Sequence, residues 1–224
     1  MSEPVRPEAM SEPVRPEEAA WGLVSEKGWV DIDRELLNRL TWVPCPPFFP
    51  EGADRESWAA DSAALWWDVS GLKHGKRQTR ALAAMLAAIH KDLYAAGHCH
   101  QAVIHLPDPR MLPLPVQLGV WQMRGGREER LRMLAHADGP EAIEPPIVEE
   151  FTTERLGTGL RALHYRRGDD GSETHGYLNY AWRLEEYETD LRLFTFCWDL
   201  SRLQRAMPDI DELARATAIV PRKW

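Results

Sequence analysis

Apolar residues between positions 79 and 96 recur at three- and four-residue spacing, which is typical of a helix with one buried face. The recurring residues are Leu82, Met85, Leu86, Ile89 and Leu93. We therefore predict a helix over 79–96 that ends at Gly97. A second helical pattern begins at Asp54 and ends near Gly71.

The second half of the chain changes to a period of two, which favours β-strands. The predicted strands cover 100–106, 115–124, 147–152, 159–167, 175–185 and 190–198. The last three are joined by the short loops 168–171 and 186–189, so we expect antiparallel hairpins there. In the strand 175–185, apolar residues alternate with Asn179 and Arg183. This alternation predicts one buried face and one solvated face.

The segment 28–52 has a mixed pattern. Residues 28–33 fit a short strand, and the Asp33 side chain can cap a brief helix over 34–40. The segment 42–52 contains four prolines, which remove backbone donors. We therefore predict an irregular loop over 42–52.

A closing helix begins at Pro208 and would lay Ile210 and Leu213 on the sheet. Residues 131–135 fit a helix or a strand equally well. The order is a short strand, helices, a run of antiparallel strands and a final helix. This order predicts an α+β protein, an antiparallel sheet with helices packed on it, formed by one domain over 21–224.

The first 20 residues contain a direct repeat, because the stretch Ser-Glu-Pro-Val-Arg-Pro-Glu follows both Met1 and Met10. The repeat is rich in Pro and Glu and has no apolar period, which predicts a disordered tail over 1–20. We leave this tail out of the reasoning about the fold.

The formal net charge is −8, which disfavours binding to nucleic acids or anionic membranes. The densest basic group consists of Arg124, Arg127, Arg130 and Arg132, and it is interleaved with Glu128 and Glu129. A solvated helix face or loop explains this group. No stretch near eighteen apolar residues and no secretory signal pattern occurs, so we expect a cytoplasmic protein without membrane insertion.

The cysteines Cys45, Cys99 and Cys197 are widely separated and lie among apolar neighbours. This favours buried, inert thiols over a disulfide framework or a catalytic nucleophile. The Gly-x-Ser-x-Gly motif of serine hydrolases and the phosphate-binding glycine loop are both missing from the sequence. We therefore predict no catalytic residue and no cofactor.

Three histidines near one another form the best candidate for a metal site. His98 and His100 are two residues apart, so on a strand they would share a face and could bind zinc or copper. His105 lies an odd number of residues from His100 and would point to the other face, and no carboxylate is in register with the pair. Histidines satisfied at a strand end are the favoured interpretation, and His98 and His100 remain weak metal candidates.

Ten tryptophans are the most unusual chemical feature of the chain. Trp58, Trp66 and Trp67 share one helical segment, with Trp58 and Trp66 on one side and Trp67 turned toward another. One of the two adjacent rings is therefore a candidate for an exposed anchor that binds a partner. The alternative is that all these indoles fill the core.

Several short signatures resemble a group of uncharacterised bacterial proteins. They are the Gly28-Trp-Val-Asp-Ile opening, a long Ala-rich helix ending in Ala-Ala-Gly, a Leu-Phe-Thr-Phe strand and a Pro-Asp-Ile-Asp-Glu-Leu-Ala helix. Those proteins resemble the PsbP-like α-β-α sandwich, and the likeness covers about 28–220. The resemblance implies an accessory or binding module of a larger assembly, in some cases encoded near type VII secretion genes.

The leading functional hypothesis is therefore a non-enzymatic, protein-binding module. Its groove would lie between the helix that carries Trp58 and Trp67, the proline-rich segment and the sheet. The alternative is a small-molecule-binding protein or enzyme whose pocket contains His98, His100 or His105. A third possibility is a homo-oligomer with a structural role.

Overall fold

A seven-stranded antiparallel sheet forms the centre of the protein in the computed structural model, which describes residues 28–95, 99–168, 171 and 173–221. Its strand order is β2 (Trp42–Cys45), β3 (Gln101–His105), β4 (Leu114–Gln122), β8 (Thr189–Cys197), β7 (Thr174–Leu184), β6 (Gly157–Arg167) and β5 (Ile147–Thr153). A separate two-stranded sheet pairs β1 (Gly28–Ile32) with β9 (Thr217–Pro221). The predicted α+β class, with helices packed on an antiparallel sheet, is confirmed.

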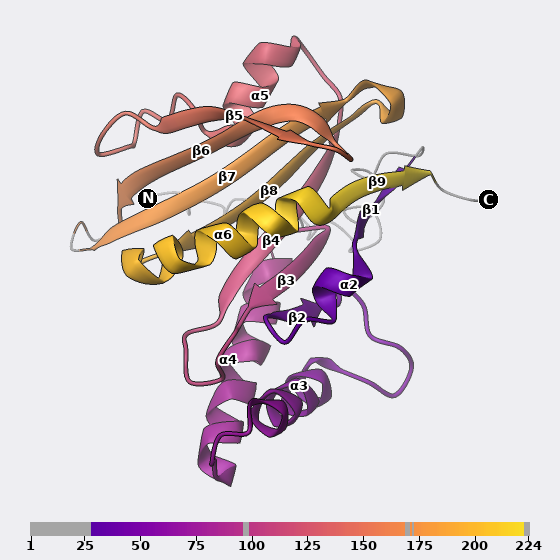
Figure 1. Ribbon diagram of the computed structural model, residues 1–224, viewed down its shortest axis with the longest axis vertical. Coiled ribbons are helices and arrows are strands. Elements are labelled where there is room, and N and C mark those ends of the chain that lie inside the picture. Colours follow the sequence, from indigo (N-terminus) through magenta and orange to yellow (C-terminus); the bar gives the residue numbers. More distant parts are fainter. Residues whose placement is uncertain (1–27, 96–98, 169–170, 172, 222–224) are drawn as a thin grey trace, which may run out of the picture.

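One face of the sheet is covered by α6 (Leu200–Ala216), which crosses the strands as the yellow helix in Figure 1. Leu203, Ile210 and Leu213 of α6 are fully buried in the main core. They share this core with Trp182 of β7 and Leu193 of β8. The β1–β9 pair continues from the end of α6, and the short helix α2 (Arg34–Leu37) follows β1.

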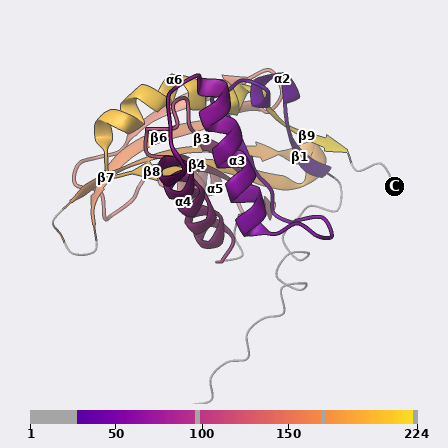
Figure 2. The same cartoon turned by 90° about the horizontal axis from the view of Figure 1, so that it is seen from below.

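The opposite face carries two separate groups of helices. The hairpin of α3 (Arg55–Ser70) and α4 (Lys76–Ala95) packs on β2 and β3, and the two helices lie together in the view of Figure 2. At the other side of the sheet, α5 (Arg127–Ala135) packs on Ala162 of β6 and Ala181 of β7. The outer surfaces of β4 and β8 lie between these two groups.

Most elements occur where the sequence pattern predicts them. Asp54 caps α3 by accepting from the backbone N–H of Ser57, and Gly71 ends α3 in the left-handed conformation. The residues 131–135, which fit two interpretations, belong to helix α5. The predicted hairpins are confirmed, because β6 pairs antiparallel with β7 and β7 with β8.

The prediction of an irregular loop over 42–52 is wrong in its first part, because β2 begins at Trp42 and contains Pro44. β2 is an edge strand that pairs with β3 alone. An edge strand tolerates proline, since the missing N–H can face away from the partner strand. The proline count therefore indicated an edge position rather than the absence of a strand.

The closing helix also differs from the prediction. It begins at Leu200 instead of Pro208, and Pro208 lies inside it. The Asp199 side chain accepts from the backbone N–H of Arg202 and fixes the start of α6. The strand β9, which pairs with β1, was missed.

The predicted solvated face of β7 is wrong as well, because Asn179 and Arg183 are buried. Their side of the sheet is the side that α5 covers. The duplicated N-terminal segment and Gly97 lie outside the described residues. No helix among the described residues is long and apolar enough to cross a membrane.

Candidate functional site

The histidines that the sequence suggested for a metal site are not gathered in one place. His98 lies outside the described residues. His100 accepts from the backbone N–H of Val120 and its ring contacts Trp121, on the face that α5 covers. His105 lies on the opposite face, where its Nε2 is 2.7 Å from Asp209 of α6. Within the described ranges, no group of three His, Cys, Asp or Glu side chains could hold a metal ion.

Of the two interpretations of Trp66 and Trp67, the structure supports core packing over an exposed anchor, because both rings are buried between α3, α4 and the β2–β3 edge. Trp66 Nε1 donates to the Leu106 carbonyl at 2.8 Å, and the Trp67 ring stacks on His74. Trp58 is partly buried and donates to the Pro44 carbonyl. Two of these indoles thus fasten the helical hairpin to the sheet, and partner binding by Trp58 stays a prediction.

An apolar groove of about 390 Å³ lies at the end of the sheet where β4 begins and β8 ends. Met85 and Ile89 of α4 form one wall, and Phe196 and Trp198 form the other. Both α4 residues belong to the apolar stripe of the sequence, yet they line this groove and Met85 is 37% exposed. Trp198 is 52% exposed. The groove therefore presents large apolar side chains to solvent.

Cys197 also borders the groove, but its thiol is buried. Burial raises the pKa of Cys197, so the protonated thiol is favoured at neutral pH. Burial likewise raises the pKa of Cys45 and of Cys99 to about 12. Cys45 and Cys197 are buried as predicted, whereas Cys99 is only part-buried.

A polar cluster lies near the groove, centred on Arg192 of β8, on the face of the sheet that α5 and the α3–α4 hairpin cover. Arg192 donates through Nε and Nη2 to the Asn179 Oδ1 atom, at 3.1 and 2.6 Å. Its guanidinium lies 4.4 Å from the centre of the Phe194 ring. Gly119 is opposite Arg192 in register, and the Trp121 ring lies so close over Gly119 that no Cβ would fit there. The Phe194 ring therefore packs on this arginine, and the Trp121 ring covers the glycine opposite it on β4.

Two histidines belong to the same group. The His136 and His164 rings stack with centres 5.9 Å apart, and His164 stacks on Tyr177. Burial and then the charge of Arg192 lower the pKa of His136 to about 4, and they lower the pKa of His164 in the same way. Both rings are therefore neutral at pH 7, and Arg192 carries the positive charge of this cluster.

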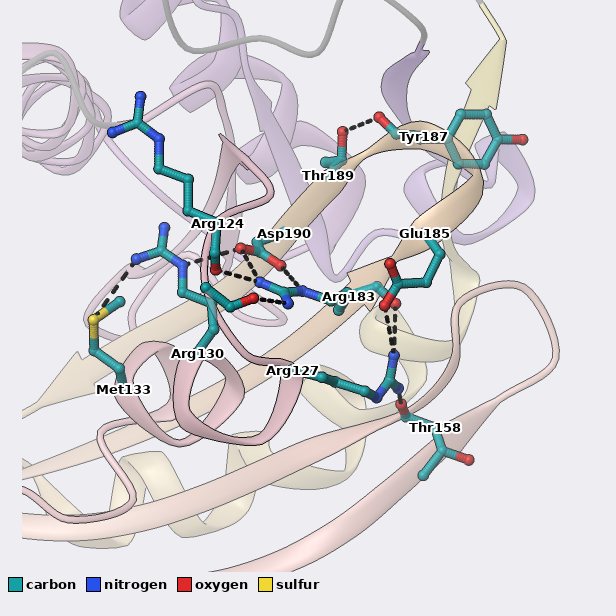
Figure 3. A network of polar contacts seen from close by, with 11 residues as sticks. Arg124, Arg127, Arg130, Met133, Thr158, Arg183, Glu185, Tyr187, Thr189 and Asp190 are labelled. Atoms are coloured by element: carbon teal, nitrogen blue, oxygen red, sulfur yellow. Dashed lines mark hydrogen bonds and ion pairs between the residues drawn. The ribbon is translucent and has the colours of Figure 1, made fainter.

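An ionic network holds α5 in place next to the cluster (Figure 3). Asp190 is fully buried and accepts from Arg183 Nε at 2.7 Å and from Arg130 Nε at 3.0 Å. Arg127 donates to the carbonyls of Arg183 and Thr158. The interpretation as a solvated charge is therefore wrong for Arg130, which pairs with the buried Asp190. Arg127 is solvated, with a side chain that is 46% exposed, and it also ties α5 to the sheet.

Sequence reasoning missed the cluster around Arg192. The available signal was a basic residue within a strand that has apolar residues on both faces, because such a residue is rarely buried without a reason. His136 and His164 gave no signal, since they are far apart in sequence and come together only by folding. Comparisons with models of known protein families and with curated proteins found no match.

Proposed function

We propose that this chain is a non-enzymatic binding module that receives an apolar segment of a protein partner in the groove between α4 and the β4–β8 end of the sheet. The observation that carries the proposal is the pair of exposed apolar walls, with Met85 on α4 and Trp198 after β8. Apolar side chains that face solvent around a groove are typical of sites that bind peptides or helices.

The place of the groove differs from the one suggested by the sequence, which relied on Trp66 and Trp67. These rings are buried, whereas Phe196 and Trp198 line the groove. A binding role therefore rests on other aromatic residues. Enzymatic use of a pocket shared by His100 and His105 is not favoured, because these side chains contact opposite faces of the sheet.

We also propose that the fold is the PsbP-like α-β-α sandwich that the sequence resembles. We further propose that the module belongs to a bacterial assembly, with secretion as one setting. Helices on both faces of an antiparallel sheet are compatible with this proposal. The resemblance to bacterial proteins encoded near type VII secretion genes supports the same role.

A peptide-display selection tests the groove. Peptides selected on the wild-type protein should carry apolar anchors, and Trp198→Ala should weaken their binding at least about tenfold, as expected for a central aromatic contact. Met85→Glu should weaken binding similarly, because it places a charge on the apolar wall. Leu65→Glu is the control, since Leu65 is 52% exposed on α3 and does not line the groove.

Folding of each variant is checked by circular dichroism before binding is measured. Equal affinity of the selected peptides for wild type, Trp198→Ala and Met85→Glu would exclude the groove as the binding site. A selection that yields only peptides sensitive to Leu65→Glu would place binding on α3 instead.

A further inference from the structure

Arg192 differs from the buried arginines Arg161 and Arg183 in how its charge is compensated. Arg161 is paired with Glu149 and Asp211, and Arg183 is paired with Asp190. Within the part of the chain that the structure describes, Arg192 has no carboxylate partner and donates only to the Asn179 amide oxygen. The buried Arg202 also has no carboxylate partner within the described residues, but it donates to the carbonyls of His105 and Leu112. A cation that is removed from water without a counter-charge is costly, so an anionic partner is the natural complement.

The free end of the guanidinium is available to such a partner. Arg192 is part-buried, and its Nη1 atom makes no hydrogen bond with any described residue and is not among the fully buried nitrogen atoms. Burial lowers the pKa of Arg192 to about 10, which leaves it charged at neutral pH. A planar guanidinium with a free nitrogen matches the oxygens of a carboxylate or a phosphate.

The neighbouring polar atoms add donors rather than negative charge. Asn179 is 0% exposed, and its Nδ2 donor has no partner. His164 is also buried, and its Nδ1 atom has no partner. Arg166, whose charge also acts on His136, is already paired with Glu141. Buried polar atoms without a protein partner beside an uncompensated cation are groups that a bound anion would satisfy.

We propose that the cluster of Arg192, Asn179, His164 and His136 is an oxyanion site that binds the carboxylate or phosphate group of a small organic ligand. The Phe194 ring packs on the guanidinium, so a planar or apolar body next to the anionic group would be favoured. The site is separate from the apolar groove, and the proposal does not depend on the protein-binding function.

Titration of the full chain with inorganic phosphate, acetate and benzoate tests the site. Binding is measured by calorimetry and by the NMR signals of the histidine rings. We expect saturable binding with a Kd below about 10 mM for at least one anion. In the wild-type protein, saturation should also raise the pKa of His136 and His164, because a bound anion favours the protonated ring.

Three variants separate the site from general charge effects. Arg192→Met should weaken binding at least about tenfold, because it removes a charge-assisted hydrogen bond. Arg192→Lys should give an intermediate affinity, since it keeps the charge and loses the planar fork. Arg205→Met is the control with the same charge change, because Arg205 is exposed on α6, the helix that covers the other face.

The three anion titrations also distinguish between possible classes of ligand. Tighter binding of phosphate than of benzoate assigns a phosphate ester, and the reverse order assigns an aromatic or apolar carboxylate. The proposal is overturned if none of the three anions saturates, or if Arg205→Met weakens binding as much as Arg192→Lys does. If Arg192→Met does not fold, unchanged pKa values of His136 and His164 in the presence of the anions overturn it equally.

Discussion

The buried ion pair between Arg183 and Asp190 offers a direct test of how α5 is held on the sheet. Asp190 is 0% exposed, and its carboxylate accepts two hydrogen bonds from Arg183 and one from Arg130 (Figure 3). Asp190→Asn keeps the size of the side chain but removes its negative charge. Arg183 would then be a buried cation without a counter-charge, and the free energy of unfolding should fall.

The structure sets the size of this loss. Removing one partner of a buried ion pair typically costs about 3–5 kcal/mol. Arg183 also donates to the carbonyls of Arg124 and Gly125, at 2.7 and 2.8 Å, and these bonds persist in the variant. We therefore expect the lower end, about 3 kcal/mol. Because a domain is stable by about 5–15 kcal/mol, the variant should still fold.

Urea unfolding followed by circular dichroism and by tryptophan fluorescence measures the effect, with coincident curves as the check for two-state behaviour. Arg39→Gln is the matched control, because it breaks an ion pair with Glu212 whose two side chains are 56% and 46% exposed. It should cost less than about 0.5 kcal/mol. The double variant Arg183→Met/Asp190→Leu should regain at least half of the loss, since it leaves neither charge of the pair buried.

A cost of Asp190→Asn below about 1 kcal/mol would refute the reasoning, because it would equal an ordinary hydrogen bond. Equal costs for Asp190→Asn and Arg39→Gln would do the same. Either result would mean that Asp190 is reached by water and that α5 is not held by this pair.

Three further predictions concern stability. Since burial and the charge of Arg192 lower the pKa of His136 from 6.5 to about 4, the unfolded chain binds this proton first as the pH falls. The free energy of unfolding should therefore decrease between pH 6.5 and about 4. The decrease should be about 1.5 kcal/mol after allowance for the partial exposure of the ring. In His136→Asn, the urea midpoint should depend less on pH over this range. Gly119→Ala would place a Cβ 2.2 Å from the Trp121 ring, so it should displace the indole, lower stability by about 1–3 kcal/mol and change the near-ultraviolet dichroism. Trp66→Phe leaves the buried Leu106 carbonyl without its donor and should cost about 1–3 kcal/mol in urea unfolding; an unchanged midpoint would contradict the buried hydrogen bond.

Sequence patterns predicted the elements correctly where contacts between residues close in sequence decide the structure. The long helix, the Asp54 cap and the hairpin strands depend on neighbours in sequence, and all of them are confirmed. Within the apolar stripe of the helix, Leu82, Leu86 and Leu93 are buried and Met85 is exposed. The errors occur where tertiary contacts decide. Pro44 is tolerated because β2 has a partner on one side alone, and no local pattern reveals an edge position.

The candidate site shows the same limit more clearly. Asn179 and Arg183 alternate with apolar residues as solvated positions do, yet α5 covers them. Alternation along a strand indicates that its two faces differ, but it does not show which polar residues will be covered by a helix distant in sequence. The partners Asp190 and Arg192 lie on another strand, so their roles depend on the register of β7 with β8.

The width of the sheet explains why both candidate sites lie on one face. Seven strands spaced at about 4.8 Å span about 29 Å, whereas a helix with its side chains is only about 10 Å wide. On this face α5 packs on β6 and β7, and the α3–α4 hairpin packs on β2 and β3. The outer sides of β4 and β8 are left between them, and they carry Gln117, Arg192 and Phe196, all part-buried. A ligand that reaches this strip contacts rigid strands in the middle of a sheet, which is the arrangement that holds binding groups most accurately.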